Sequence, residues 1–263
     1  MSDQALGSLA MVTQSFNARE VLHAQPLTRV PTASGISFFN VSITARHAPE
    51  LSPALVGSGV YGLFQRRSED TSADLIYIGK YQGHRDQPFA GNVAQQRWWT
   101  HIASVTARGD RMSISRRTAQ YLKTQHCLGA DIKSFRELAV DATQNEVLFQ
   151  DRGCVAGLNR ILFALRHWDQ FRPESNPDLL APFFFHYVRL VPQSTVTAVQ
   201  AIQKQSSVKA LRSLISQAEN ALIQQLNPPC NHQAQADSQA VTMTPEAFEH
   251  HCVATLNRVN DGR

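Results

Sequence analysis

Cysteine, long apolar runs and blocks of like charge are all scarce in this chain of 263 residues. Its four cysteines are widely spaced and form no CxxC pair, so neither a zinc site nor a disulfide framework is expected. No apolar run reaches the roughly 18 residues that a membrane-spanning helix needs, and the first residues lack the pattern of a secretory signal. Charged residues make up 17% of the chain without long runs of one sign, which argues against disorder. We therefore expect a folded cytoplasmic protein without a membrane partner.

Basic residues concentrate in one segment, although the net charge of the whole chain is only +4. Between Gly59 and Arg117, nine Lys and Arg stand against five acids, so this segment alone carries the excess of the chain. Such a patch suits contact with a phosphate backbone, and a solvated basic loop is the alternative. The basic residues expected to contact nucleic acid are Lys80, Arg85, Arg108, Arg111, Arg116 and Arg117.

Hydrophobic periodicity predicts alternating strands and helices over much of the chain. Strands are expected at 36–45, 59–65, 74–80 and 183–191, and the second and third of these form a hairpin with a long loop. Helices are expected at 92–105, 134–139, 158–171 and 195–226, the last with a break near 206–207 and an end at Asn227-Pro228-Pro229, and a short one is expected after Thr244-Pro245.

Glu219 is an anomaly within the helix that precedes Pro228. It lies four residues after Ile215 and three before Leu222, so it projects from the apolar stripe of the helix. A carboxylate in that position must be hydrogen-bonded, paired or bound to a cation. The ordinary interpretation is a stripe-edge carboxylate that reaches solvent or a salt bridge, and the functional one is a ligand for Mg²⁺, which prefers oxygen donors.

Two further groups of polar residues lie on predicted elements. Arg97 and His101 are four residues apart on the helix at 92–105 and therefore neighbours on one of its faces. An Arg can bind a phosphate with two donors, and a His can relay a proton near neutral pH, although an ordinary polar helix edge is the alternative. Tyr61 and Tyr77 lie on the two hairpin strands, where half-buried packing is the common role of tyrosine. A catalytic phenol would need a nearby cation to lower its pKa from about 10.

The order of these residues resembles the signature of the GIY-YIG nuclease family. Gly59-Val60-Tyr61 is followed by Tyr77-Ile78-Gly79 on the next strand, with Val in place of the usual Ile. Arg97 matches the family's arginine on the first helix, and His101 matches a histidine of some of its restriction endonucleases. Glu219 matches the metal-binding glutamate, and Asn231, with Asn227 as the alternative, matches the asparagine that follows. Five elements in the correct order are more specific than either tripeptide alone.

The resemblance implies an α+β fold with a small mixed or antiparallel three-stranded sheet flanked by helices and a large, mostly helical insertion. It divides the chain into an N-terminal extension with a strand (1–58), a first part of the nuclease core (59–105), the insertion (106–181), a second part of the core (182–231) and a C-terminal tail (232–263). The insertion, which begins with four arginines, is the expected region of DNA recognition and dimer contact.

The resemblance also implies hydrolysis of a phosphodiester in double-stranded DNA. Glu219 would hold Mg²⁺, for which Mn²⁺ could substitute, and Tyr61, directly or through His101, would take the proton of the attacking water. Arg97 would stabilise the charge of the transition state, Tyr77 would orient water or phosphate, and Asn231 would brace the site. A Type II restriction enzyme is expected, a homodimer with a cognate DNA methyltransferase encoded nearby. The alternatives are a repair or mobile-element endonuclease and a catalytically inert nucleic-acid-binding module.

Overall fold

The computed structural model describes residues 9–26, 41–66, 72–85, 87–109, 112–114, 118, 154–171, 178–192, 205–231 and 240–261. Contacts within the chain divide it into two compact units. The larger unit consists of Met1–Val21, Arg46–Arg97 and Ala181–Arg263, and the smaller one of Leu22–Ala45 and Trp98–Leu180. Arg111, Arg116 and Arg117, three of the basic residues expected to contact nucleic acid, and the helix predicted at 134–139 lie outside the described residues.

A five-stranded antiparallel sheet forms the centre of the larger unit, in the order β1-β8-β4-β5-β9. Its strands are β1 (Leu9–Asn17), β8 (Phe183–Pro192), β4 (Ser58–Arg66), β5 (Ala73–Tyr81) and β9 (Val241–Met243). The three middle strands occupy the positions predicted at 183–191, 59–65 and 74–80. In β4 every residue except the last is buried, which explains why its sequence is a continuous apolar run rather than an alternation.

The prediction of a small three-stranded sheet is wrong, because two further segments extend the sheet. Nine residues of β1 pair with β8, but their sequence, LAMVTQSFN, shows no clean apolar alternation, since several of its side chains are exposed. The three residues of β9 are too short to give a pattern at all. Both strands join the sheet through main-chain hydrogen bonds, which sequence periodicity does not report.

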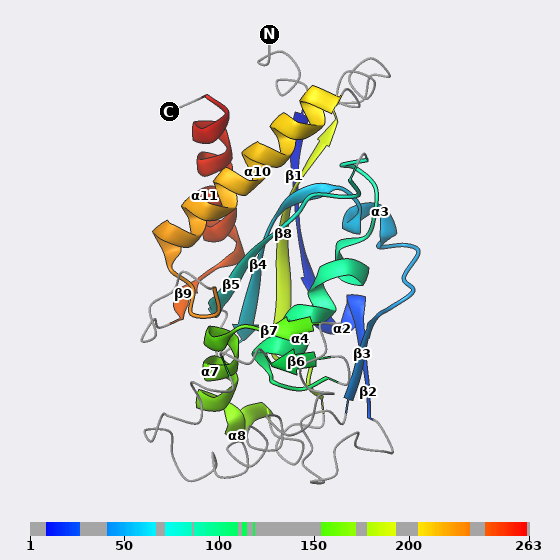
Figure 1. Ribbon diagram of the computed structural model, residues 1–263, viewed down its shortest axis with the longest axis vertical. Helices are drawn as coiled ribbons and strands as arrows, with labels where there is room; N and C mark the ends of the chain where they lie inside the picture. Colours follow the sequence, from blue (N-terminus) through cyan, green and yellow to red (C-terminus); the bar gives the residue numbers. More distant parts are fainter. Residues whose placement is uncertain are drawn as a thin grey trace. The chain divides into compact units, whose positions relative to one another are not determined.

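Two long helices cover one face of this sheet, as Figure 1 shows for α10 (Gln205–Leu226) and α11 (Pro245–Asn260). Their apolar residues form one core with the sheet, and Phe248, Cys252 and Leu256 of α11 are as buried in it as Leu211 and Ile215 of α10. The segment that the sequence suggested was a polar tail therefore supplies a strand and a 16-residue helix to the larger unit.

The ends of these helices follow the signals in the sequence. Thr244 caps α11, its hydroxyl accepting a hydrogen bond from the N–H of Ala247, and Pro245 takes the first helical position. At the end of α10, Asn227 adopts a left-handed conformation (φ 43°), its N–H donates to the carbonyl of Ile223, and Pro228 follows. The predicted break near 206–207 is not observed, since α10 runs without interruption from Gln205.

The rest of the larger unit consists of short elements. α2 (Ala18–Val21) contacts β1 and β8. α3 (Ser52–Leu55) precedes β4. The predicted helix at 92–105 is confirmed, and it begins as one π-helical turn, η2 (Ala94–Trp98), which bears Arg97. None of the helices in the described ranges combines the length and apolar character needed to cross a bilayer.

The smaller unit is built around α4 (Trp99–Val105), which contacts four of its other elements. These are β3 (Val41–Ala45), β6 (Met112–Ile114), β7 (Cys154–Ala156) and α7 (Leu158–Arg166). β3 pairs antiparallel with β2 (Leu22–Pro26), β6 and β7 pair with each other in parallel, and α8 (Trp168–Phe171) follows α7. The described part of 106–181 thus contains paired strands as well as the predicted helix near 158–171, whereas a mostly helical insertion was expected.

Candidate functional site

Tyr61 and Tyr77 lie on the same face of two neighbouring strands. The β4–β5 register pairs Tyr61 with Gly79 and Leu63 with Tyr77, and directly paired residues of an antiparallel sheet share a face. The two rings lie 6.5 Å apart between centroids. The Tyr61 ring covers Gly79, since a Cβ added there would lie 2.6 Å from both the Cζ atom and the hydroxyl oxygen of Tyr61. The two tripeptides of the sequence signature are therefore packed against each other.

Tyr61 is the more enclosed of these two phenols. Its side chain is 1% exposed and its ring also lies edge-on to the rings of Phe185 and Tyr187 on β8, at 6.4 and 6.2 Å between centroids. Tyr77 is only half-buried. A phenol that exchanges a proton with water needs access to it, so this geometry favours Tyr77 over Tyr61 for that task.

Asn231 holds the main chain of β5 between Tyr77 and Gly79. The N–H of Ile78 donates to Asn231 Oδ1 at 2.9 Å, and Asn231 Nδ2 donates to the carbonyl of Ile78 at 2.7 Å. The N–H of Cys230 donates to the carbonyl of Ile76, a residue that the β4–β5 register passes over at a bulge. Residues 230–231 thus stabilise β5 at the YIG tripeptide, and the side chain of Asn231 is almost fully buried there.

Glu219 meets Lys80, the residue that follows the YIG tripeptide. Lys80 Nζ lies 2.7 Å from Glu219 Oε2, and the glutamate side chain is 12% exposed. Gln82 Nε2 donates hydrogen bonds to Ser216, one turn before Glu219 on α10, and to the carbonyl of Arg212, two turns before it. The Glu219 side chain, which projects from the apolar stripe, therefore forms a salt bridge with Lys80 at the edge of the core.

Tyr81, the last residue of β5, is influenced by the charge of Arg97. Burial raises the pKa of the Tyr81 phenol, and the positive charge of Arg97 opposes that rise. The Tyr81 hydroxyl is buried and has no hydrogen-bond partner in the described part of the chain, whereas Arg97 is exposed. Sequence reasoning missed Tyr81, although its place two residues after Gly79 on β5 puts it on the same face.

The residues of the signature divide between the two faces of the sheet. Tyr61 and Tyr77 lie on one face, and Lys80, paired with Val60, lies on the other, which α10 covers. Among the described residues Lys80 is the bonding partner of Glu219, and neither Tyr61 nor Arg97 bonds to it. The two phenols, the guanidinium and the carboxylate were expected to surround a single cation. In the described residues no direct bond joins the carboxylate to the phenols or to the guanidinium.

At Glu219 the described residues offer a metal ion a single carboxylate. They contain no group of three or more His, Cys, Asp or Glu that could hold a metal ion. Glu219 Oε1 has no protein partner in the same ranges, and the hydroxyl of Ser216, three residues earlier, lies on its side of α10. One carboxylate with neutral oxygens and several waters is a donor set that suits Mg²⁺, provided that Lys80 releases Glu219.

His101 belongs to the smaller unit, where it is 5% exposed on α4. It therefore does not belong to an ordinary polar helix edge, which was the alternative to the functional role predicted from its spacing from Arg97. Arg108 is also buried in this unit, and its Nη1 donates to the carbonyl of Phe171 at 3.0 Å. A guanidinium held in this way contributes to the fold of the unit rather than to a basic surface, whereas Arg85 is exposed as expected.

Comparison with known proteins gives no match: no family model fits the chain, and neither a curated protein nor a solved structure is significantly similar to it. The assignment of a function therefore rests on the residues and their geometry.

Proposed function

We propose that this protein is a sequence-specific, Mg²⁺-dependent endonuclease of the GIY-YIG type that cuts double-stranded DNA in the cytoplasm, as the homodimeric nuclease of a restriction-modification pair. The observation that carries the proposal is the gathering of four signature segments around residues 77–81 of β5. Tyr61 covers Gly79, Asn231 binds Ile78, Glu219 binds Lys80, and Arg97 acts electrostatically on Tyr81. These segments are far apart in the sequence, and a chance tripeptide would not bring them together.

The proposed chemistry follows from the charge of the substrate. A phosphodiester gains negative charge towards its transition state, so an exposed guanidinium such as that of Arg97 stabilises it. Glu219 lies on the other face of the sheet, beside Lys80 and beyond the part of β5 that β9 pairs with, so Mg²⁺ bound there would supply Lewis-acid activation to a phosphate that crosses this edge. Tyr77, half-buried, orients water or accepts its proton, and the enclosed Tyr61 holds the strand pair in register.

The decisive experiment compares plasmid cleavage by wild type, Glu219→Gln and Glu219→Ala with Mg²⁺ or Mn²⁺. Both variants are expected to lose at least about 100-fold in rate, the usual scale for removing one group that stabilises the transition state. They should still bind duplex DNA in Ca²⁺, measured by gel shift. Gln224→Ala, an exposed substitution on the same helix, is the matched control and should cut at the wild-type rate.

The outcomes separate the proposal from its alternatives. Discrete fragments support a restriction enzyme, and sequencing of their ends gives the recognition site. Nicks that depend on DNA structure indicate a repair or mobile-element nuclease, and binding without cleavage indicates an inert module. Wild-type cleavage by Glu219→Ala would overturn the assignment of the metal ligand.

A further inference from the structure

A serine, a histidine and a glutamate form a connected chain on the sheet face that α10 and α11 cover. The β1–β8 register pairs Ser15 directly with His186. Ser15 Oγ lies 2.8 Å from His186 Nδ1, within hydrogen-bond distance. The other ring nitrogen, Nε2, lies 3.6 Å from Glu249 Oε2 on α11. His186 is also paired with Gly62, the neighbour of Tyr61, so the chain lies on the sheet face opposite Tyr61.

The histidine in this chain is held as a neutral base. His186 is 5% exposed, and the ring of Phe248 lies edge-on to it at 6.1 Å between centroids. Burial lowers its pKa below the ordinary value, and the charges of Glu249 and Glu246 on α11 only partly offset that effect. Its Nε2 atom is buried and makes no hydrogen bond within the described part of the chain. Of the two neutral tautomers, the one protonated at Nε2, the nitrogen nearer Glu249, leaves Nδ1 able to accept the proton of the Ser15 hydroxyl.

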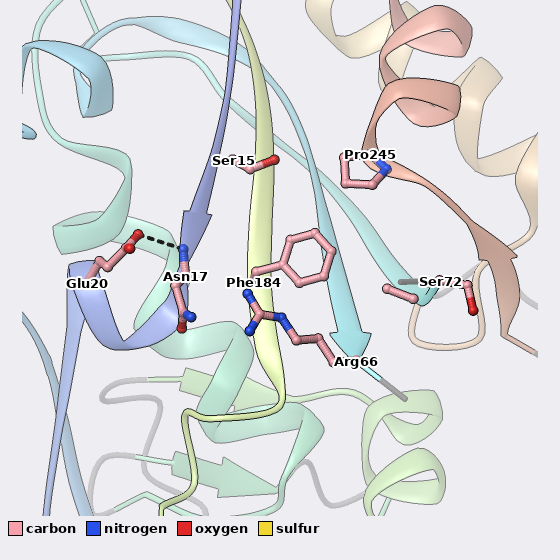
Figure 2. Close-up of a pocket in the computed structure, with 8 residues that line it drawn as sticks. Ser15, Asn17, Glu20, Arg66, Ser72, Phe184 and Pro245 are labelled. Carbon is pink, nitrogen blue, oxygen red and sulfur yellow. Dashed lines mark hydrogen bonds between the residues drawn. The ribbon is translucent and has the colours of Figure 1, made fainter. Parts of the chain in front are cut away.

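The serine opens onto a pocket of about 530 Å³, drawn in Figure 2. Ser15 is exposed although its histidine partner is buried. The floor of the pocket includes the ring of Phe184, and the guanidinium of Arg66 lies 5.4 Å from the centre of that ring. The pocket therefore offers an accessible hydroxyl, an apolar surface and a cation within one cavity.

We propose that Ser15 is a nucleophile for acyl transfer from small carboxylic esters, with His186 as its general base and Glu249 as the carboxylate that orients the histidine. This activity is separate from the proposed nuclease, because it uses other residues, on β1, β8 and α11 rather than on β5 and α10. The apolar part of the ester would lie on Phe184, and the guanidinium of Arg66 would face the oxyanion of the tetrahedral intermediate.

Each step conserves atoms and charge. Ser15 Oγ attacks the carbonyl carbon, an Oγ–C bond forms, and the hydroxyl proton moves to His186 Nδ1. The tetrahedral intermediate collapses, the bond to the leaving alkoxide breaks, and the alkoxide takes the proton from the imidazolium. Water then gives a proton to Nδ1 while its oxygen forms a bond to the acyl carbon. The bond between that carbon and Ser15 Oγ breaks, Oγ takes the proton from the imidazolium, and the carboxylic acid leaves.

The test uses an alkyl fluorophosphonate, which phosphonylates an activated serine and releases fluoride. Wild type is expected to gain one adduct, mapped to Ser15 by mass spectrometry, and Ser15→Ala none. Ser213→Ala, at an exposed serine of α10, is the matched control and should label at the wild-type rate. His186→Gln should label at least about 100-fold more slowly, as expected for loss of a general base. Glu249→Gln, whose side chain is partly exposed, should slow labelling about tenfold without affecting the fold.

The pH dependence gives a readout that a merely structural histidine would not change. Because the pKa of His186 is lowered, its base form predominates above the ordinary value of 6.5, so the labelling rate should be constant there and fall in more acidic buffer. Hydrolysis of p-nitrophenyl acetate should show the same profile and the same order of variants. Absence of an adduct on Ser15, or equal labelling of wild type and Glu249→Gln, would overturn the proposal. Plasmid cleavage by Ser15→Ala should equal that of wild type, so the two activities fail or succeed independently.

Discussion

At the scale of single residues, the contacts around the YIG tripeptide depend on the lack of a side chain at Gly79 and on the side-chain amide of Asn231. Gly79 leaves room for the Tyr61 ring, and Asn231 satisfies both main-chain groups of Ile78. These contacts explain why a glycine and an asparagine stand at those positions whatever reaction the site performs. They make predictions about stability that do not depend on activity.

Gly79→Ala is expected to destabilise the protein by about 1–3 kcal/mol, the usual range for overpacking a well-packed site. The added Cβ would lie 2.6 Å from the Cζ atom and the hydroxyl oxygen of Tyr61. Urea denaturation measures the change. In a Tyr61→Leu background, which lacks those atoms, the same substitution should be much less costly, and an equal cost in both backgrounds would contradict the packing that we describe.

Asn231→Ala should lower the free energy of unfolding by about 2–4 kcal/mol, since it leaves a buried N–H and a buried C=O without partners. Amide hydrogen exchange at Ile78 should accelerate as well, because its N–H donates to Asn231. Asn220→Ala, an exposed substitution on α10, serves as the control. An unchanged exchange rate at Ile78 would show that the side chain of Asn231 does not hold this strand in solution.

At the scale of elements, the sequence predicted best where a pattern was long and strongly apolar. The positions of β4, β5 and β8 and the end of α10 at Asn227-Pro228 were predicted because buried strands and helix stops leave such signals. β1 was missed, because an edge strand with exposed side chains joins a sheet through its main chain. The length of α11 was underestimated, because the apolar residues that pack into the core are separated by polar ones.

In the candidate site, too, the features that depend on local sequence were predicted and those that depend on distant contacts were not. The spacing of Tyr61, Tyr77 and Gly79 predicted a close strand pair, since a hairpin register is a local property. Lys80 as the partner of Glu219, and the burial of His101, depend on contacts between distant segments or within a separate unit. Helical spacing determines which residues share a helix face but not what that face meets. For that reason neither the partner of Glu219 nor the burial of His101 could be predicted from the sequence.

Phe248→Ala tests whether α11 belongs to the core of the larger unit. The Phe248 ring is fully buried and lies edge-on to the ring of Phe64 at 5.6 Å, so its removal should cost about 3–5 kcal/mol. Asn257→Ala, at an exposed position of the same helix, should change the free energy of unfolding by less than about 0.5 kcal/mol. A small cost for Phe248→Ala would mean that the helix is only peripherally attached.

At the scale of the whole molecule, stability should depend on pH through His186. This histidine joins β8 to β1 through Ser15 and faces Glu249 on α11, so its protonation state affects three elements of the larger unit. Burial lowers its pKa in the folded protein, so between that pKa and 6.5 the unfolded chain binds more protons than the folded one. Acidification over this range therefore favours unfolding.

The free energy of unfolding should accordingly rise as the pH increases towards 6.5, and the contribution of this residue should level off above it, since 6.5 is the ordinary pKa of histidine. Urea titrations at several pH values measure the slope. His186→Gln should flatten it, because the group that binds the extra proton on unfolding is gone. His250→Gln, at an exposed position of α11, should keep the wild-type slope. Equal slopes for His186→Gln and wild type would place the proton uptake elsewhere and remove His186 from the coupling between the sheet and α11.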